Sequence, residues 1–219
     1  MKPKLAIFDL DGTLLNTIAD LATSTNHALN LCGFPQHQTE EYRYFVGNGI
    51  NKLFERALPA EERTEENIMR IRKLFIPYYD MHNAVFSQPY PGVADLLEEL
   101  QAMRLHLAVA SNKYQSATEK LVSHYFPTIK FDVVLGQRDE VPVKPHPQIV
   151  HDILSATGCQ ESETIYIGDS GVDMQTANNA AVSSIGVTWG FRPKEELVQH
   201  SPTHIVDTTL EILRIIKEI

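Results

Sequence analysis

The sequence predicts an α/β fold in which a mostly parallel sheet carries a helical unit inserted after its first strand. Two observations lead to this prediction. Short apolar runs recur along the chain with amphipathic helical periods between most of them, an alternation typical of βαβ units. The stretch from about residue 15 to residue 82 breaks the alternation, because its apolar residues follow helical spacing nearly throughout.

The expected strands are short, uniformly apolar and rich in β-branched residues. Such strands fit a sheet that helices cover on both faces. In chain order they are LAIF at 5–8, LHLAVA at 105–110, FDVVL at 131–135, TIYI at 164–167, SSIGV at 183–187 and THIV at 203–206. The helices between the later strands are expected to begin at Val93, Ser116, Pro147 and Val172.

The inserted segment is expected to contain four helices. Residues from Ile18 to Cys32 keep helical spacing, and Thr17 with Asp20 resembles a capping box at the start of this first helix. The other three are expected to begin near Thr39, after Gly49 and near Thr64. We expect the fourth helix to end or kink at Pro77, because proline removes a helical hydrogen bond.

These elements predict two domains. The α/β core is expected to comprise residues 1–14 and 87–219, and a helical cap with its linkers to comprise residues 15–86. The turn-rich stretch SQPYPG at 87–92 would return the chain to the core.

Composition and charge limit the classes of partner. The chain has 219 residues, a formal net charge of −9 and 43% hydrophobic residues, which is an ordinary globular composition. Nucleic acids and anionic membranes need a basic face, so we expect neither as a partner. No apolar run approaches the ~20 residues that span a bilayer, and Cys32 and Cys159 lie far apart. We expect a cytoplasmic monomer or homodimer, and a small phosphorylated metabolite remains a suitable partner.

Polar residues follow four of the expected strands. Ligands of open α/β sheets bind outside the carboxyl ends of the strands, where these residues would meet at one edge. They are Asp9, Asp11 and Thr13 after the first strand, Ser111, Asn112 and Lys113 after the second, Lys144 after the third, and Asp169, Ser170 and Asp173, preceded by Gly168, after the fourth. Alone, each group fits a turn, a helix cap or a solvated loop; their convergence favours a shared site.

The converging residues suit metal-assisted phosphoryl transfer. Asp9, Asp11 and Asp169 form an oxygen-rich set suited to Mg²⁺, which binds carboxylates and keeps positions for water and phosphate. A carboxylate beside a metal and a lysine such as Lys144 stays ionised, so it can attack phosphorus and form an aspartyl phosphate. Ser111 offers a hydrogen bond to phosphate, and a second aspartate can act as acid and base.

Four segments of the chain resemble the four motifs of the haloacid dehalogenase superfamily. They are DLDGT at 9–13, Ser111, Lys144 and GDSGVD at 168–173. The resemblance covers essentially the whole chain, including a helical cap inserted after the first motif. It implies a Rossmann-like core and a Mg²⁺-dependent phosphotransferase mechanism.

The same resemblance implies roles for individual residues. Asp9 would be the nucleophile and a metal ligand, and Asp11 would be the general acid and base with its backbone carbonyl on the metal. Asp169 would complete the metal site, and Asp173 would support it or hold Lys144. Because dehalogenases lack the second acid, Asp11 favours phosphoryl transfer over dehalogenation.

Within the superfamily the chain is most similar to phosphoglycolate phosphatases. NTIADL at 16–21 and VGNGI at 46–50 resemble their cap entrance and cap loop. The glycines of that loop can bring backbone N–H groups close to a substrate carboxylate. The expected substrate contacts are Thr13, Ser111, Asn112, Lys144, Gly47, Asn48 and Gly49.

Other functions stay open at this point. Leu21 stands where phosphoglucomutase-like phosphotransferases carry a cap histidine, which disfavours that activity, and Asn16 stands where many relatives have Asp. Pyrophosphate, a nucleotide or a sugar phosphate are alternative substrates. A phosphorylatable regulatory module of receiver type also has acidic residues and a lysine at strand ends, but it has no helical unit after its first strand. A catalytically silent metabolite-binding module is a further alternative.

Overall fold

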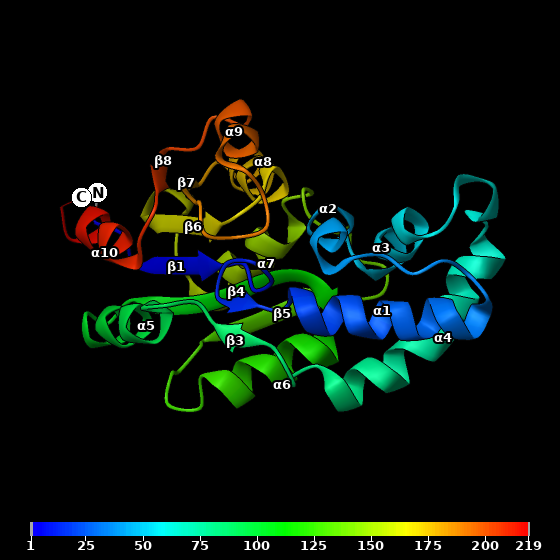
Figure 1. Cartoon of the computed structure of the whole chain (residues 1–219). Coiled ribbons are helices and arrows are strands. Elements are labelled where there is room, and N and C mark those ends of the chain that lie inside the picture. Colours follow the sequence, from blue (N-terminus) through cyan, green and yellow to red (C-terminus); the bar gives the residue numbers. More distant parts are fainter. Residues whose placement is uncertain (1, 219) are drawn as a thin grey trace.

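The centre of the fold is a six-stranded parallel sheet (Figure 1), seen in a computed structural model that describes residues 2–218. The strands lie in the order β5-β4-β1-β6-β7-β8, and every neighbouring pair is parallel. They are β1 (Leu5–Phe8), β4 (His106–Tyr114), β5 (Val133–Gln137), β6 (Thr164–Gly168), β7 (Ser183–Val187) and β8 (His204–Val206). The predicted α/β fold is confirmed, and each expected strand is present.

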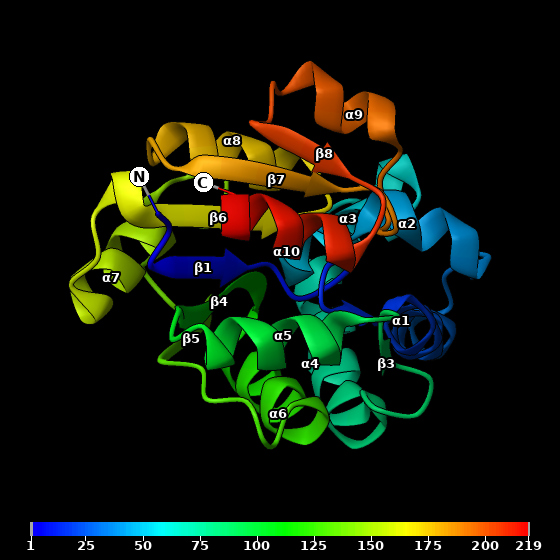
Figure 2. The same cartoon turned by 90° about the vertical axis from the view of Figure 1, so that its left-hand side faces the viewer.

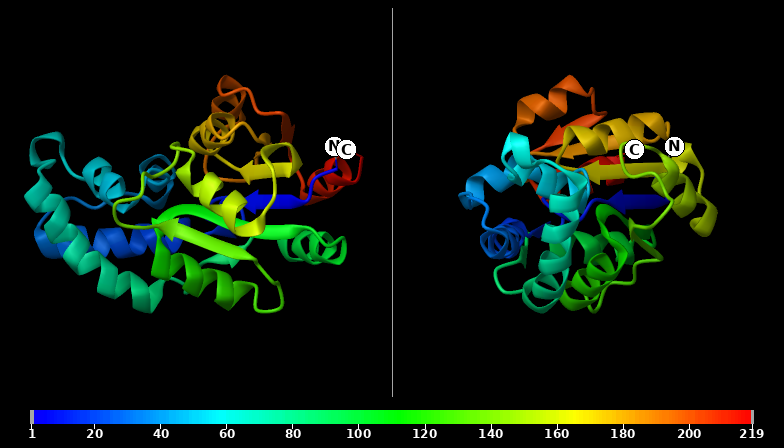
Figure 3. Two further views of the ribbon diagram at one scale, coloured as in Figure 1. Left: turned by 180° about the vertical axis from the view of Figure 1, so that it is seen from behind. Right: turned by 90° about the vertical axis from the view of Figure 1, so that its right-hand side faces the viewer.

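Helices cover both faces of this sheet. Successive residues of β1 point to opposite sides, and both sets of its side chains pack against helices. Ala6 and Phe8 belong to an apolar cluster with α5, α6 and α10, whereas Leu5 and Ile7 belong to a second cluster with α7 and α8. Figure 2 shows α5 and α10 in front of the strands, and the rear view in Figure 3 shows α7 in front of them. The helices of this part are α5 (Val93–Ala102), α6 (Gln115–Tyr125), α7 (Gln148–Thr157), α8 (Gly171–Asn179), α9 (Lys194–Gln199) and α10 (Thr209–Glu218), with a 3₁₀ turn at Glu161–Glu163.

Four further helices lie beyond the carboxyl end of β1, where its arrow points in Figure 1. They enclose an apolar cluster of their own, which includes Leu29, Tyr42, Phe54 and Phe75, all fully buried. These helices are α1 (Ile18–Cys32), α2 (Tyr42–Phe45), α3 (Ile50–Ala57) and α4 (Glu65–His82), with 3₁₀ turns at Thr39–Glu41 and Ala60–Glu62. No helix within residues 2–218 is long and apolar enough to cross a membrane.

The chain enters and leaves this helical segment through two paired strands. The short strands β2 (Leu15–Asn16) and β3 (Gln88–Pro89) are antiparallel neighbours. Just outside them, the Tyr90 N–H donates to the Leu14 carbonyl at 3.1 Å. The two crossings between the sheet and the helical segment therefore lie side by side.

The expected capping box at the start of α1 is wrong. Thr17 precedes the helix but its hydroxyl makes no capping bond, because it donates to the carboxylate of Asp11 at 2.6 Å. The Asp20 carboxylate instead accepts hydrogen bonds from the backbone N–H groups of Phe86 and Ser87 and from the Ser87 hydroxyl. Both side chains thus connect the helical segment to the residues that flank it.

Of the two expectations at Pro77, the end of α4 is wrong, since the helix continues to His82, and the kink stays a prediction. Pro77 is exposed, so the carbonyl that it deprives of a partner can bond to water. Phe75 and Tyr79, on either side of it, are fully buried and hold the helix in place. Packing therefore outweighs the local cost of the proline.

Candidate active site

The carboxyl ends of β1 and β6 meet where the sheet connections change direction. From β1 the chain continues to β4 and β5 on one side, whereas β6, β7 and β8 extend the sheet on the other. Open α/β sheets bind ligands at such a switch point. Asp9 directly follows β1 and Asp169 directly follows β6, and the Asp9 N–H donates to the Ile167 carbonyl at 2.9 Å.

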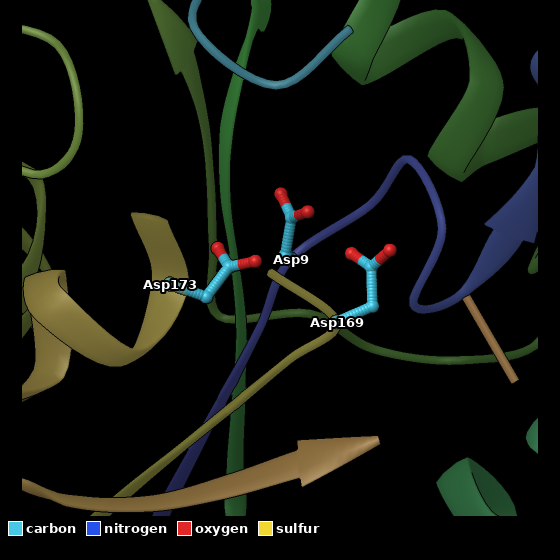
Figure 4. Close-up of side chains that lie close together, drawn as sticks. All are labelled: Asp9, Asp169 and Asp173. Carbon is cyan, nitrogen blue, oxygen red and sulfur yellow. The ribbon is translucent and has the colours of Figure 1, made fainter. Parts of the chain in front are cut away.

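Three buried aspartates gather their carboxylates at this point (Figure 4). One oxygen each from Asp9, Asp169 and Asp173 lie within 4.8 Å of one another. Burial, followed by repulsion from Asp173, raises the pKa of Asp9 from 3.8 to about 7. The same causes raise the pKa of Asp169 well above its ordinary value. The cluster thus concentrates negative charge that a cation would neutralise.

Lys144 is the positive group beside this cluster. Its Nζ donates to Asp9 Oδ1 and to Asp173 Oδ1, in both cases at 2.8 Å. It also donates to the Ala110 carbonyl at 2.9 Å and to the Tyr166 hydroxyl at 3.0 Å. Burial alone would lower the pKa of Lys144, but the two carboxylates outweigh it and raise that pKa well above its usual value. Lys144 is therefore a fixed and charged group.

The Asp11 carboxylate makes its contacts outside the cluster. Lys113 Nζ lies 3.0 Å from Asp11 Oδ2, and Thr17 donates to Asp11 Oδ1. The three clustered carboxylates therefore include Asp173, whereas the sequence suggested Asp11. The backbone carbonyl of Asp11, which the resemblance assigns to the metal, stays a prediction.

Close packing around Asp169 explains the glycine of the DLDGT motif. Gly12 has a φ of +95°, and a Cβ there would lie 2.3 Å from Asp169 Oδ2. A Cβ at Gly190 would lie equally close to the same side chain. The backbone N–H of Phe191 donates to Asp169 Oδ2 at 2.7 Å, and the Thr13 hydroxyl donates to Oδ1 at 3.3 Å. Larger residues at either glycine would displace this carboxylate.

Asn112 joins the end of β4 to the helical segment. Its Nδ2 donates to the Gly47 carbonyl at 2.9 Å and to the Lys144 carbonyl at 3.1 Å, and its Oδ1 accepts from the Lys144 N–H at 2.9 Å. The Ser111 hydroxyl accepts from the Lys113 N–H at 3.1 Å. Neither residue caps a helix, because β4 continues past both of them.

Comparison with known proteins identifies the family. The sequence pattern of the haloacid dehalogenase-like hydrolases matches residues 6–187. The chain belongs to this family of hydrolases. The phosphoglycolate phosphatase of Vibrio parahaemolyticus is 31% identical over 218 residues, covering 97% of this chain and 96% of that protein. The phosphoglycolate phosphatase of Agrobacterium fabrum is 34% identical over 210 residues, covering 93% and 88%.

Solved structures of the same family superpose closely on the hydrolase. A crystal structure of a predicted phosphoglycolate phosphatase from Haemophilus somnus has a TM-score of 0.91 at 30% identity, covering 98% of both chains. A predicted phosphatase from Clostridium acetobutylicum has a TM-score of 0.90 at 24% identity, which supports the fold alone. The predicted resemblance to the haloacid dehalogenase superfamily, and to its phosphoglycolate phosphatases, is confirmed.

A cavity of about 60 Å³ lies between the strand ends of the hydrolase and its helical segment. At ~10–15 Å³ for each water, this volume holds about four to six water-sized groups. Its polar lining includes Asp9, Asp11, Gly47, Gly49, Ser111, Asn112, Lys113, Lys144, Asp169, Asp173 and Arg192, and its apolar lining includes Leu21, Ile50, Leu53, Phe75, Tyr79 and Phe191. Two expected substrate contacts lie outside this lining: Thr13 bonds to Asp169, and Asn48 Oδ1 accepts from Arg56 at 2.7 Å.

Sequence reasoning assigns no role to three residues that the structure brings to the site. Lys113 pairs with Asp11, the Tyr166 hydroxyl contacts Lys144, and Arg192 donates to the Val46 carbonyl at 2.9 Å. Lys113 belongs to the polar residues expected at the strand ends, but no role follows from that position alone. Tyr166 and Arg192 lie in a strand and a loop with no distinctive local pattern.

Proposed function

We propose that the hydrolase is a Mg²⁺-dependent phosphatase that hydrolyses a small phosphomonoester, 2-phosphoglycolate, through an aspartyl phosphate on Asp9. One observation supports this most: the Asp9 carboxylate belongs to a buried acidic cluster and accepts a hydrogen bond from Lys144 at 2.8 Å. Burial and the neighbouring carboxylates raise the pKa of Asp9, so its carboxylate needs cations beside it to stay ionised; Lys144 is one, and the cluster offers oxygen ligands for another. The names of the curated relatives support the substrate.

The donor set of the acidic cluster fits Mg²⁺. Three carboxylate oxygens lie within 4.8 Å of one another, and Mg²⁺ prefers hard oxygen ligands. We propose that Asp9, Asp169 and the backbone carbonyl of Asp11 hold the ion, with Asp173 in support. When bound, the ion supplies positive charge to the carboxylates and to the phosphoryl oxygens.

Asp9 is the proposed nucleophile. Its Oδ1 accepts from Lys144, so Oδ2 is free to attack phosphorus. The bond from Asp9 to phosphorus forms as the bond from phosphorus to the leaving oxygen breaks, and Asp11 gives that oxygen a proton. A water molecule then attacks phosphorus, Asp11 takes the proton from the water, and the bond to Asp9 breaks to release phosphate. Lys144 stabilises the negative charge of the transferring oxygens.

Residues 15–86 are proposed to form the cap that closes over this reaction. Two hydrogen bonds hold its loop against the sheet: Asn112 donates to the Gly47 carbonyl, and Arg192 donates to the Val46 carbonyl. A closed cap excludes bulk water and selects the leaving group.

The expected cytoplasmic location and the choice between monomer and homodimer stay predictions.

The lining of the cavity suits a small substrate, because the cavity lies directly beside the acidic cluster and Lys144. Gly47 and Gly49 line this space with φ values of +117° and +84°, so no side chain from these positions occupies it. Pyrophosphate is comparably small, and it stays the main alternative substrate.

The test measures hydrolysis of 2-phosphoglycolate, pyrophosphate, a nucleoside monophosphate, a hexose phosphate and p-nitrophenyl phosphate, with Mg²⁺ and with EDTA. We expect 2-phosphoglycolate to have the highest kcat/KM and EDTA to abolish turnover. Asp9→Asn should abolish turnover without unfolding the protein, and the exposed Asp95→Asn should leave it unchanged. A kcat/KM for 2-phosphoglycolate no higher than that for p-nitrophenyl phosphate would contradict 2-phosphoglycolate as the substrate. No Mg²⁺-dependent hydrolysis at all would favour a metabolite-binding module.

A further inference from the structure

The buried ammonium group of Lys113 has more N–H donors than it has partners within residues 2–218. Its side chain is 3% exposed, and it lines the cavity between the strand ends and the helical segment. A lysine ammonium carries three N–H donors. Within residues 2–218, Asp11 is the one group to which this ammonium is joined by an ion pair or hydrogen bond. Buried donors are normally satisfied, so the remaining ones call for an acceptor.

The hydroxyl of Tyr79 is a second buried group without a partner. Tyr79 is fully buried, and its hydroxyl forms no hydrogen bond with any residue from 2 to 218. Its ring also lines the cavity, and Lys113 Nζ lies 4.8 Å from the ring centre. Burial raises the pKa of Tyr79 well above its ordinary value, and among the charges Asp11 contributes most, so the hydroxyl stays a donor near that carboxylate. Tyr79, with its unused hydroxyl, and Lys113, with its incompletely used ammonium, therefore line the same cavity.

The other two cations of the cavity make contacts of their own with the protein. Four oxygen atoms of the protein lie within hydrogen-bond distance of Lys144 Nζ, one more than its three N–H donors. Arg192 donates to the Val46 carbonyl, lies 3.7 Å from a carboxylate oxygen of Glu196 and covers the ring of Tyr44. Of these three cations, Lys113 is the one whose ammonium contacts both Asp11 and the ring of Tyr79, and it keeps N–H donors for a ligand in this space.

We propose that Lys113 and the hydroxyl of Tyr79 form a subsite for a carboxylate on the leaving group of the substrate. This inference rests on the proposed phosphatase function and adds the residues that select the substrate class, phosphorylated 2-hydroxy acids. Asp11, the proposed proton donor to the leaving oxygen, contacts Lys113 directly. A carboxylate one carbon away from that oxygen therefore falls beside the same ammonium, which offsets its repulsion from Asp11.

The test compares two substrates that differ only in the carboxylate. 2-Phosphoglycolate and ethyl phosphate share the phosphoryl group and a two-carbon chain, and the ratio of their kcat/KM values measures recognition of the carboxylate. We expect Lys113→Met to lower this ratio about 30-fold and Tyr79→Phe about 10-fold, the effects of losing one hydrogen bond to a charged group. The matched control is Lys52→Met, which removes a lysine that pairs with Glu55 outside the cavity and should leave the ratio unchanged.

Three outcomes would overturn the subsite as proposed. Equal losses on both substrates would make Lys113 a positioning residue for Asp11, and an unchanged ratio in Tyr79→Phe would remove the hydroxyl from recognition. Tyr79→Phe deletes a hydroxyl that has no partner within residues 2–218, so this variant should fold even if Lys113→Met does not. A wild-type enzyme that hydrolyses both esters equally overturns the carboxylate subsite alone. A wild type that hydrolyses neither overturns the phosphatase function itself.

Discussion

Replacing Lys144 with methionine is the most direct test of how the site is held together. Methionine has a similar length but no charge and no donor. The change removes the hydrogen bonds to Asp9 and Asp173, both 2.8 Å long, and leaves two buried carboxylates without their shared cation. It also removes the donor to the Ala110 carbonyl.

The structure sets the size of the effect. Lys144 is 3% exposed, so solvent screens its ion pairs little. Removing one partner of a buried ion pair costs about 3–5 kcal/mol of unfolding free energy. For a chain of this length, that corresponds to a fall in Tm of about 6–20 °C. At pH 5.5 the cost should be smaller, because protonation of the Asp9 carboxylate, whose pKa is raised to about 7, relieves part of the uncompensated charge.

The assay is urea unfolding in EDTA at pH 7.5 and pH 5.5, followed by the fluorescence of Trp189, the single tryptophan of the chain. Trp189 Nε1 donates to the Thr13 carbonyl at 3.1 Å, so it reports on the DLDGT loop as well as on the fold. Lys52→Met is the matched control, because that lysine is exposed. A cost below about 1 kcal/mol at pH 7.5, or an equal cost at both pH values, would refute the view that Lys144 neutralises the cluster.

Two further predictions concern the acidic cluster and the crossing strands. The pKa of Asp9 is about 7 in the folded protein against 3.8 ordinarily, so without metal the folded state holds more protons and its stability should fall as pH rises through this window. The unfolding free energy in EDTA should therefore be about 2 kcal/mol larger at pH 5.5 than at pH 7.5, at 1.36 kcal/mol per pH unit, and Tm should be higher at pH 5.5. Mg²⁺ should stabilise more at pH 7.5, and Asp9→Asn should flatten the dependence. Asp20→Asn should lower the unfolding free energy by about 2 kcal/mol in urea titrations, because a charged acceptor of the Phe86 and Ser87 N–H groups is lost; an unchanged midpoint would contradict this role.

The parallel sheet was predictable because strands that helices cover on both faces are short, uniformly apolar runs of sequence. LAIF at 5–8 has no polar residue to break the pattern, and both of its faces are buried. The rule that strand ends converge then places Asp9 beside Asp169 without any knowledge of packing. Lys144 also followed from this rule, although it comes after β5 with a delay.

Contacts between the helical segment and the sheet were not predictable in this way. The pair of Lys113 with Asp11 depends on how the end of β4 meets the loop after β1, which no local pattern encodes. Asp20 satisfies a capping motif in sequence, yet it bonds to residues more than sixty positions away. Pro77 is a helix breaker locally, and burial of Phe75 and Tyr79 overrides it.

Because the two crossing strands β2 and β3 are neighbours, the helical segment can be replaced as one continuous piece of chain. The hydrogen bond between Tyr90 and Leu14 joins the residues just outside the two paired strands, so a short turn between them would close the chain without moving β1 or α5. A helical segment of another shape could be spliced in at the same two positions. Substrate range can thus change by trading one continuous piece of sequence, while Asp9 and Asp169, outside that piece, keep their places.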